Sequence, residues 1–168
     1  AARMASELVP DYDGVLIGAI GTRDSTDAIL RVVTKASCVI LAGGSSERYG
    51  APKQLLDYHG TPFIRKVAQT ALDAGLDPVT VVVGAVVEPI RGALDGLPVT
   101  IVENPEWAAG QSTSLRAGVT ALPERTGSAI FMLSDQPQVR PELLRRLVDR
   151  HQTTLAPVVA PFVGEQRA

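Results

Sequence analysis

The sequence predicts an α/β fold with three layers, in which helices cover both faces of a mainly parallel sheet. Short apolar runs alternate with helical patterns along the chain. The runs are continuous rather than alternating in polarity, as is typical of strands buried on both faces. The strand–helix–strand order favours parallel pairing. Ligands of such folds bind at the carboxyl ends of the strands, so the residues after each strand are the first candidates for a site.

The patterns place the individual elements as follows. Strands are expected at 15–20, 38–41, 79–83, 98–102, 129–133 and 158–163. Helices are expected at about 24–33, 62–75, 86–95, 112–122 and 140–153. The second of these helices carries an apolar stripe at i, i+3 and i+4 spacing. We expect Thr61 to cap it, Pro62 to occupy its first turn and Gly75 to end it.

Composition excludes several classes of protein. The chain has 168 residues, a formal charge of −2 and one cysteine. The charge gives no reason to expect nucleic acid or an anionic membrane as partner, and no apolar run is long enough to span a bilayer. Cys38 lies in a predicted strand, so we expect a core thiol rather than a nucleophile. We expect a cytoplasmic protein without a signal peptide, because acidic residues interrupt its start.

The chain divides into two unequal parts. Residues 1–35 are expected to be an N-terminal appendage or the tail of a preceding domain, since 1–34 hold too few elements to fold alone. Residues 36–168 are expected to form the main domain.

A glycine-rich loop, 42-AGGSSERYGAPK-53, follows the strand at 38–41. Its glycines allow positive φ and close approach of the backbone to a ligand, so several N–H groups can converge on phosphate oxygens. The loop is neither G-x-G-x-x-G nor a P-loop. We favour anion binding over a plain flexible connection, with ligand contacts from Leu41, Ala42, Gly43, Gly44, Ser45, Ser46, Arg48, Gly50 and Lys53.

An aspartate follows the strand at 129–133. Asp135 lies in the run Ser134-Asp135-Gln136-Pro137. A carboxylate at the carboxyl end of a strand, opposite a phosphate loop, is well placed to hold Mg²⁺ together with phosphate oxygens. The alternative is a plain Asp-x-Pro turn, but the pairing with the loop favours the metal.

A third segment, 104-NPEWAAGQSTSLRAG-118, combines a turn glycine, Gly110, with polar residues at a helix start. These residues can cap the helix and donate hydrogen bonds to a base or ribose. Trp107 is expected to be a packing anchor. We expect nucleotide or substrate contacts from Gln111, Ser112, Ser114 and Arg116, with Arg116 directed to a phosphate or a second substrate.

These three segments together resemble the molybdenum cofactor nucleotidyltransferases over residues 36–168. Residues 41–56 resemble the signature L-A-(A/G)-G-x-S-x-R-M-G-x-x-K-x-L-L, with Tyr49 in place of the usual Met. Asp135 stands in the L-x-D-x-P motif, and 104–118 is similar to the N-P-x-W-x-x-G-x-x-x-S-L-x-x-G pattern of the cytidylyltransferase branch. Gly43 makes the loop LAGG, which is more usual in the guanylyltransferase branch, so the loop alone does not choose the base.

The resemblance implies a Rossmann-like nucleotidyltransferase fold and transfer of CMP from CTP to molybdopterin with release of pyrophosphate. Arg48, Lys53 and Asp135 would be catalytic, with Mg²⁺, or Mn²⁺ instead, on Asp135. The family supplies a further acidic residue from beyond the end of this chain, so the domain is expected to be incomplete at its C-terminus. Residues 1–34 faintly resemble the end of a fused upstream domain linked to selenium-dependent molybdenum hydroxylase maturation, which makes such a hydroxylase a candidate partner. The alternatives are a transferase using GTP or a sugar phosphate, and a non-catalytic module that carries the cofactor.

Overall fold

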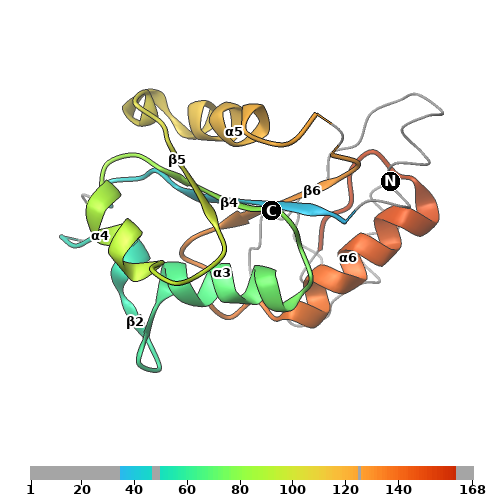
Figure 1. Ribbon diagram of the computed structural model, residues 1–168, viewed down its shortest axis with the longest axis horizontal. Helices are drawn as coiled ribbons and strands as arrows, with labels where there is room; N and C mark the ends of the chain where they lie inside the picture. Colours follow the sequence, from blue (N-terminus) through green and yellow to red (C-terminus); the bar gives the residue numbers. More distant parts are fainter. Residues whose placement is uncertain (1–34, 47–49, 125, 162–168) are drawn as a thin grey trace.

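A four-stranded parallel sheet forms the centre of the molecule. The computed structural model describes residues 35–46, 50–124 and 126–161 (Figure 1). The strands lie in the order β5 (Thr100–Glu103), β4 (Val79–Val83), β1 (Ser37–Ala42) and β6 (Ala129–Leu133). Every neighbouring pair is parallel, with β1 between β4 and β6. The predicted α/β fold is therefore confirmed.

Helices cover both faces of this sheet. On one face lie α3 (Phe63–Asp73), α4 (Val87–Ala93) and α6 (Pro141–Thr154), and on the other lies α5 (Gln111–Thr120) (Figure 1). A small hairpin of β2 (Asp57–Tyr58) and β3 (Thr61–Pro62) precedes α3. The three predicted layers are thus present in the described part of the chain.

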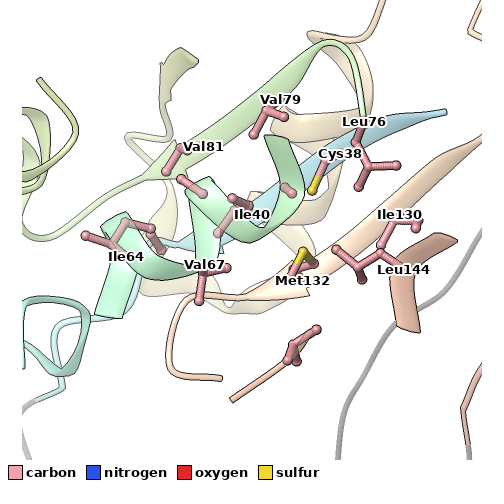
Figure 2. Packing of buried hydrophobic residues seen from close by; sticks show 14 of the residues in the cluster. Cys38, Ile40, Ile64, Val67, Leu76, Val79, Val81, Ile130, Met132 and Leu144 are labelled. Carbon is pink, nitrogen blue, oxygen red and sulfur yellow. The ribbon is translucent and has the colours of Figure 1, made fainter. Parts of the chain in front are cut away.

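The two faces of β1 explain why its sequence is apolar from Cys38 to Ala42. Cys38, Ile40 and Ala42 pack in the cluster beneath α3 and α6, which Figure 2 shows from close by. Val39 and Leu41 point the other way, into the cluster beneath α5. All six residues of β1 are buried, and each fully buried aliphatic side chain stabilises the fold by about 1.5–3 kcal/mol.

The strand predicted at 158–163 is wrong over the residues that the structure describes. Residues 158–161 form no strand, and 162–168 lie outside the described residues. Pro157 precedes the predicted strand and Pro161 lies within it, and neither has an amide hydrogen to give to a sheet ladder. The strand predicted at 15–20 and the helix at 24–33 also lie outside the described residues.

Two helix starts differ from the prediction, whereas one helix end agrees with it. Thr61 pairs with Tyr58 in the hairpin, so it does not cap α3, which begins at Phe63. Gly110 holds the N-cap position of α5, so Ser112 does not cap it either. Gly75 does end α3: its φ is +84° and its N–H donates to the carbonyl of Leu72 at 2.9 Å. Within the described ranges, no helix has the length and apolar character to cross a membrane.

Candidate functional site

An open cleft of about 710 Å³ lies at the carboxyl edge of the sheet. Segments that follow β1, β5 and β6 form its walls. These segments lie far apart in sequence, but they meet because parallel strands end at the same edge. Its lining residues are Leu41, Gly43, Gly44, Ser45, Ser46, Lys53, Gln54, Trp107, Gln111, Ser114, Leu133, Ser134 and Asp135.

The glycine-rich loop forms one wall, but its glycines act differently from the prediction. Positive φ was expected of Gly43, Gly44 and Gly50, yet of these only Gly50 has it, at +74°. Ser46 also adopts positive φ, at +57°. Gly43 instead packs closely against α5, because a Cβ there would lie 2.7 Å from the Ser114 hydroxyl oxygen. The loop and the start of α5 are therefore in direct contact.

A buried glutamine holds the loop in shape. The Gln54 side-chain amide donates to the carbonyl of Gly44 at 2.7 Å and to that of Ala42 at 3.3 Å. The backbone N–H of Lys53 donates to the Ser46 hydroxyl at 3.1 Å. Gln54 is only 4% exposed. Gln54 was not among the residues predicted from the sequence; the signal was an amide at the start of an apolar Gln-Leu-Leu run.

Asp135 lies across the cleft on the turn after β6. Ser134 N–H donates to the carbonyl of Leu41 at 3.2 Å, which ties this turn to the end of β1. Asp135 is exposed at the cleft. Within the described ranges its carboxylate has no ion-pair or hydrogen-bond partner. No group of three or more His, Cys, Asp or Glu side chains gathers as a ready metal site in that part of the chain.

The remaining wall comes from the segment between β5 and α5. Trp107 lines the cleft and packs over Gly84, where a Cβ would lie 2.7 Å from the Trp107 Cγ. Trp107 was expected to be a packing residue, and it both packs against Gly84 and lines the cleft. Asn104, just after β5, bonds to the first turn of α5 through Thr113 and Ser114. Gly110 turns the chain into that helix with a φ of +119°, which side chains rarely adopt.

Most of the residues predicted from the sequence meet in this cleft. Leu41, Gly43, Gly44, Ser45, Ser46, Lys53, Gln111, Ser114 and Asp135 all line it. Four do not: Ala42 is buried, and Gly50, Ser112 and Arg116 are exposed away from the lining. Arg48 lies outside the described residues. Gln54, Trp107, Leu133 and Ser134 are the lining residues that the predicted set lacked.

The fold and the cleft define a class of α/β proteins that bind ligands at the carboxyl edge of a parallel sheet, here beside a glycine-rich loop. Within that class, the chain belongs to the family of MobA-like NTP transferase domains, which it matches over residues 38–168. It is therefore a nucleotidyltransferase-type domain. The residues before 38 lie outside the match.

Curated relatives carry several functional names. The chain is 32% identical to nicotine blue oxidoreductase of Paenarthrobacter nicotinovorans over 115 residues, which are 68% of this chain and 56% of that protein. It is also 32% identical to a probable molybdenum cofactor guanylyltransferase of Natronomonas pharaonis, over 73% of this chain and 60% of the relative. The chain thus spans less than two thirds of these relatives.

Solved structures show the same fold. Rv0371c of Mycobacterium tuberculosis H37Rv superimposes with a TM-score of 0.64 at 35% identity, covering 72% of this chain and 62% of that one. The same protein in complex with manganese gives a TM-score of 0.58 over 72% and 61%. A CMP:2-keto-3-deoxy-manno-octonic acid synthetase complexed with CTP gives 0.60 at 25% identity, over 73% and 49%. The Rossmann-like nucleotidyltransferase fold is therefore confirmed.

Proposed function

We propose that the protein transfers CMP from CTP to molybdopterin and releases pyrophosphate. The observation that supports this most is the meeting of three separate segments in one cleft: the loop after β1, the start of α5 and Asp135 after β6. Membership of the NTP transferase family supports the reaction type. The cytidylyl-type segment 104–118 and the relative named for the molybdenum cofactor support the two substrates.

In this reaction the terminal phosphate of molybdopterin attacks the α-phosphate of CTP, and pyrophosphate leaves. Such a transfer needs positioning and neutralisation of charge rather than a protein nucleophile. Lys53 lines the cleft beside the loop, and its ammonium would hold the triphosphate. Arg48 would add a second positive charge. The Gln54 amide binds the carbonyls of Ala42 and Gly44 and so fixes the backbone of the loop. The N–H groups of this fixed backbone would donate to phosphate oxygens.

The donor set of the cleft fits a magnesium ion. Mg²⁺ takes one or two carboxylates and completes its shell with phosphate oxygens and water. The Asp135 carboxylate lines the cleft next to Ser134. Among the described residues, no ion pair competes for this carboxylate. Asp135 would hold the ion, which supplies neutralisation of the phosphate charge. The manganese complex of a related structure supports a divalent cation of this kind.

GTP is the second candidate for the nucleotide. Two relatives are named molybdenum cofactor guanylyltransferases, and Gly43 gives the loop its LAGG form. The names of relatives therefore favour GTP, whereas the segment 104–118 and the CTP complex of a related structure favour CTP. A molybdenum hydroxylase partner, a cytoplasmic location, the role of residues 1–35 and the cofactor-carrying alternative remain predictions from the sequence.

Pyrophosphate release tests the proposal. The protein is given Mg²⁺, molybdopterin and either CTP or GTP, and product formation is measured for the native protein and for Asp135→Ala. We expect turnover with CTP that the substitution reduces at least about a hundredfold, since it removes a charged metal contact. Turnover with GTP alone would replace CTP in the proposal. Full activity in Asp135→Ala would remove Asp135 from the mechanism.

A further inference from the structure

Asn104 stands at a junction of three parts of the cleft wall. It directly follows β5, and its N–H donates to the carbonyl of Val83 at 2.8 Å. Its side chain is buried, at 5% exposed, and reaches both the segment that carries Trp107 and the first turn of α5. It does not line the cleft itself.

The orientation of this amide is determined by its neighbours. The Glu106 backbone N–H donates to Oδ1 of Asn104 at 3.0 Å. A backbone N–H can only donate, so a flipped amide would set two donors against each other. The Nδ2 group of Asn104 therefore faces α5, where it donates to the hydroxyl oxygens of Thr113 at 2.8 Å and Ser114 at 3.0 Å.

The two hydroxyls that receive these bonds differ in where their hydrogens go. The Thr113 hydroxyl donates within the chain, to the carbonyl of Gly110 at 2.8 Å or that of Glu106 at 3.0 Å. The Ser114 hydroxyl has no acceptor in the part of the chain that the structure describes, although Ser114 is 4% exposed and lines the cleft. Since the residue lines the open cleft, the hydrogen of this hydroxyl is available to water or to a ligand that replaces the water.

We infer that Asn104 is a positioning residue that makes the Ser114 hydroxyl a hydrogen-bond donor toward the cleft, so that Ser114 recognises an acceptor atom of the nucleotide base. Because Nδ2 occupies a lone pair of the Ser114 oxygen, the hydroxyl hydrogen points to the ligand. A base carbonyl or an unprotonated ring nitrogen is the group that fits. The inference rests on the proposed function, since it names the base contact of the same site.

Two substitutions of Asn104 test the assignment. Asn104→Asp keeps the shape and the acceptor for Glu106 but replaces the donors with a carboxylate oxygen, to which the Ser114 hydroxyl would turn. Asn104→Ser is uncharged; a Ser side chain can still accept from the Glu106 N–H but has only one hydrogen to give. Gln69→Glu is the matched control for charge, because Gln69 is a half-buried amide on α3 that does not line the cleft.

The dissociation constants of CTP, GTP, UTP and ATP are first measured with Mg²⁺, and the nucleotide that binds most tightly is chosen. The measured quantity is the dissociation constant of ribose 5-triphosphate, also with Mg²⁺, divided by that of the chosen nucleotide. Ribose 5-triphosphate keeps the charge and lacks the base, so a general loss of the site leaves the ratio unchanged. We expect either Asn104 variant to lower the ratio about tenfold, as one lost hydrogen bond with its desolvation allows. Ser114→Ala should lower it equally, without adding to the effect of Asn104→Asp. Gln69→Glu should leave it unchanged.

The other outcomes each decide a separate point. An unchanged ratio in the Asn104 variants, or in Ser114→Ala, overturns the assignment. So do additive effects in the double variant. If both Asn104 variants fail to fold, or weaken both ligands equally, Asn104 is a structural residue only. If the native chain binds no nucleotide, the proposed function is overturned, and the base contact with it.

Discussion

Gly84 and Trp107 pack so closely that a side chain at residue 84 would overlap the indole. A Cβ built on Gly84 lies 2.7 Å from the Trp107 Cγ and 2.7 Å from the carbonyl oxygen of Gly43. The Gly43 carbonyl in turn accepts the N–H of Ala85 at 3.1 Å. Trp107 and the glycine-rich loop thus both pack against Gly84, the residue that follows β4.

This contact predicts that Gly84→Ala displaces Trp107 and reshapes the cleft wall. We expect a loss of about 1–3 kcal/mol in the free energy of unfolding, as for overpacking in a core, and weaker nucleotide binding. Chemical denaturation and calorimetric titration measure the two effects. Gly92→Ala in α4 is the control, since a Cβ there meets nothing within 4 Å; it should stabilise the chain by about 0.5–1 kcal/mol. Equal stability of Gly84→Ala and the native chain would show that Trp107 moves freely.

Gln54 is predicted to hold the loop in its binding shape. Gln54→Leu keeps the volume but leaves the carbonyls of Ala42 and Gly44 without their donor, at a cost of about 1–3 kcal/mol in the free energy of unfolding. Nucleotide affinity should fall as well, because the loop N–H groups lose their common orientation. Denaturation and titration again supply the readouts. Gln69→Leu, at a half-buried position on α3 that does not line the cleft, should change neither. If it changes both as much as Gln54→Leu does, the loop has no special dependence on Gln54.

Lys53 is predicted to contact the triphosphate. Lys53→Met removes the charge and should weaken binding of Mg²⁺-bound nucleotide about tenfold or more, the scale of a lost charge-assisted hydrogen bond. The loss should be smaller at high salt, because ions screen the native attraction. Lys66→Met on α3, away from the cleft lining, is the control. Equal affinities for the two variants would contradict a direct role for Lys53.

Cys38 makes stability depend on alkaline pH. The thiol is fully buried, and desolvation by burial raises its pKa well above the usual range. The folded state therefore keeps a proton that the unfolded state releases above its own pKa of about 8.5. Stability should be unaffected below that pH and fall by about 1.4 kcal/mol per pH unit above it. Denaturation of the native chain and of Cys38→Ala at several pH values below and above this pKa gives the slope. A slope equal in the two proteins would contradict the prediction.

The sequence predicted the sheet well because burial on both faces leaves a clear pattern. In β1, the residues from Cys38 to Ala42 alternate between two opposite apolar clusters, so both faces of this stretch favour apolar side chains. The same pattern was misleading at 158–161, where prolines prevent ladder pairing. Apolar character reports burial, whereas strand formation also needs a neighbour with free backbone groups.

The site was predicted in outline, and the parts that were missed share a cause. Residues next to glycines or at strand ends, such as Gly43 and Asp135, are visible in sequence because their type suits a ligand. Gln54 and Asn104 act on the backbone or on another side chain rather than on the cleft directly. The hydrogen-bond partners of Gln54 and Asn104 lie about ten residues away in sequence. Neither the helix period nor the strand period predicts contact at that separation. Only the folded chain brings those pairs together.

In the proposed reaction, this cleft binds a nucleoside triphosphate through Asp135 and a divalent cation. The most direct measurement is thermal unfolding of the chain with CTP and with GTP, each with and without Mg²⁺, for the native chain and Asp135→Asn. Selective binding to the native state must raise the melting temperature. We predict a rise that requires Mg²⁺, is larger with CTP than with GTP, and is lost in Asp135→Asn. No rise with either nucleotide would contradict nucleotide binding in this cleft, and a rise equal in both proteins would contradict the role of Asp135.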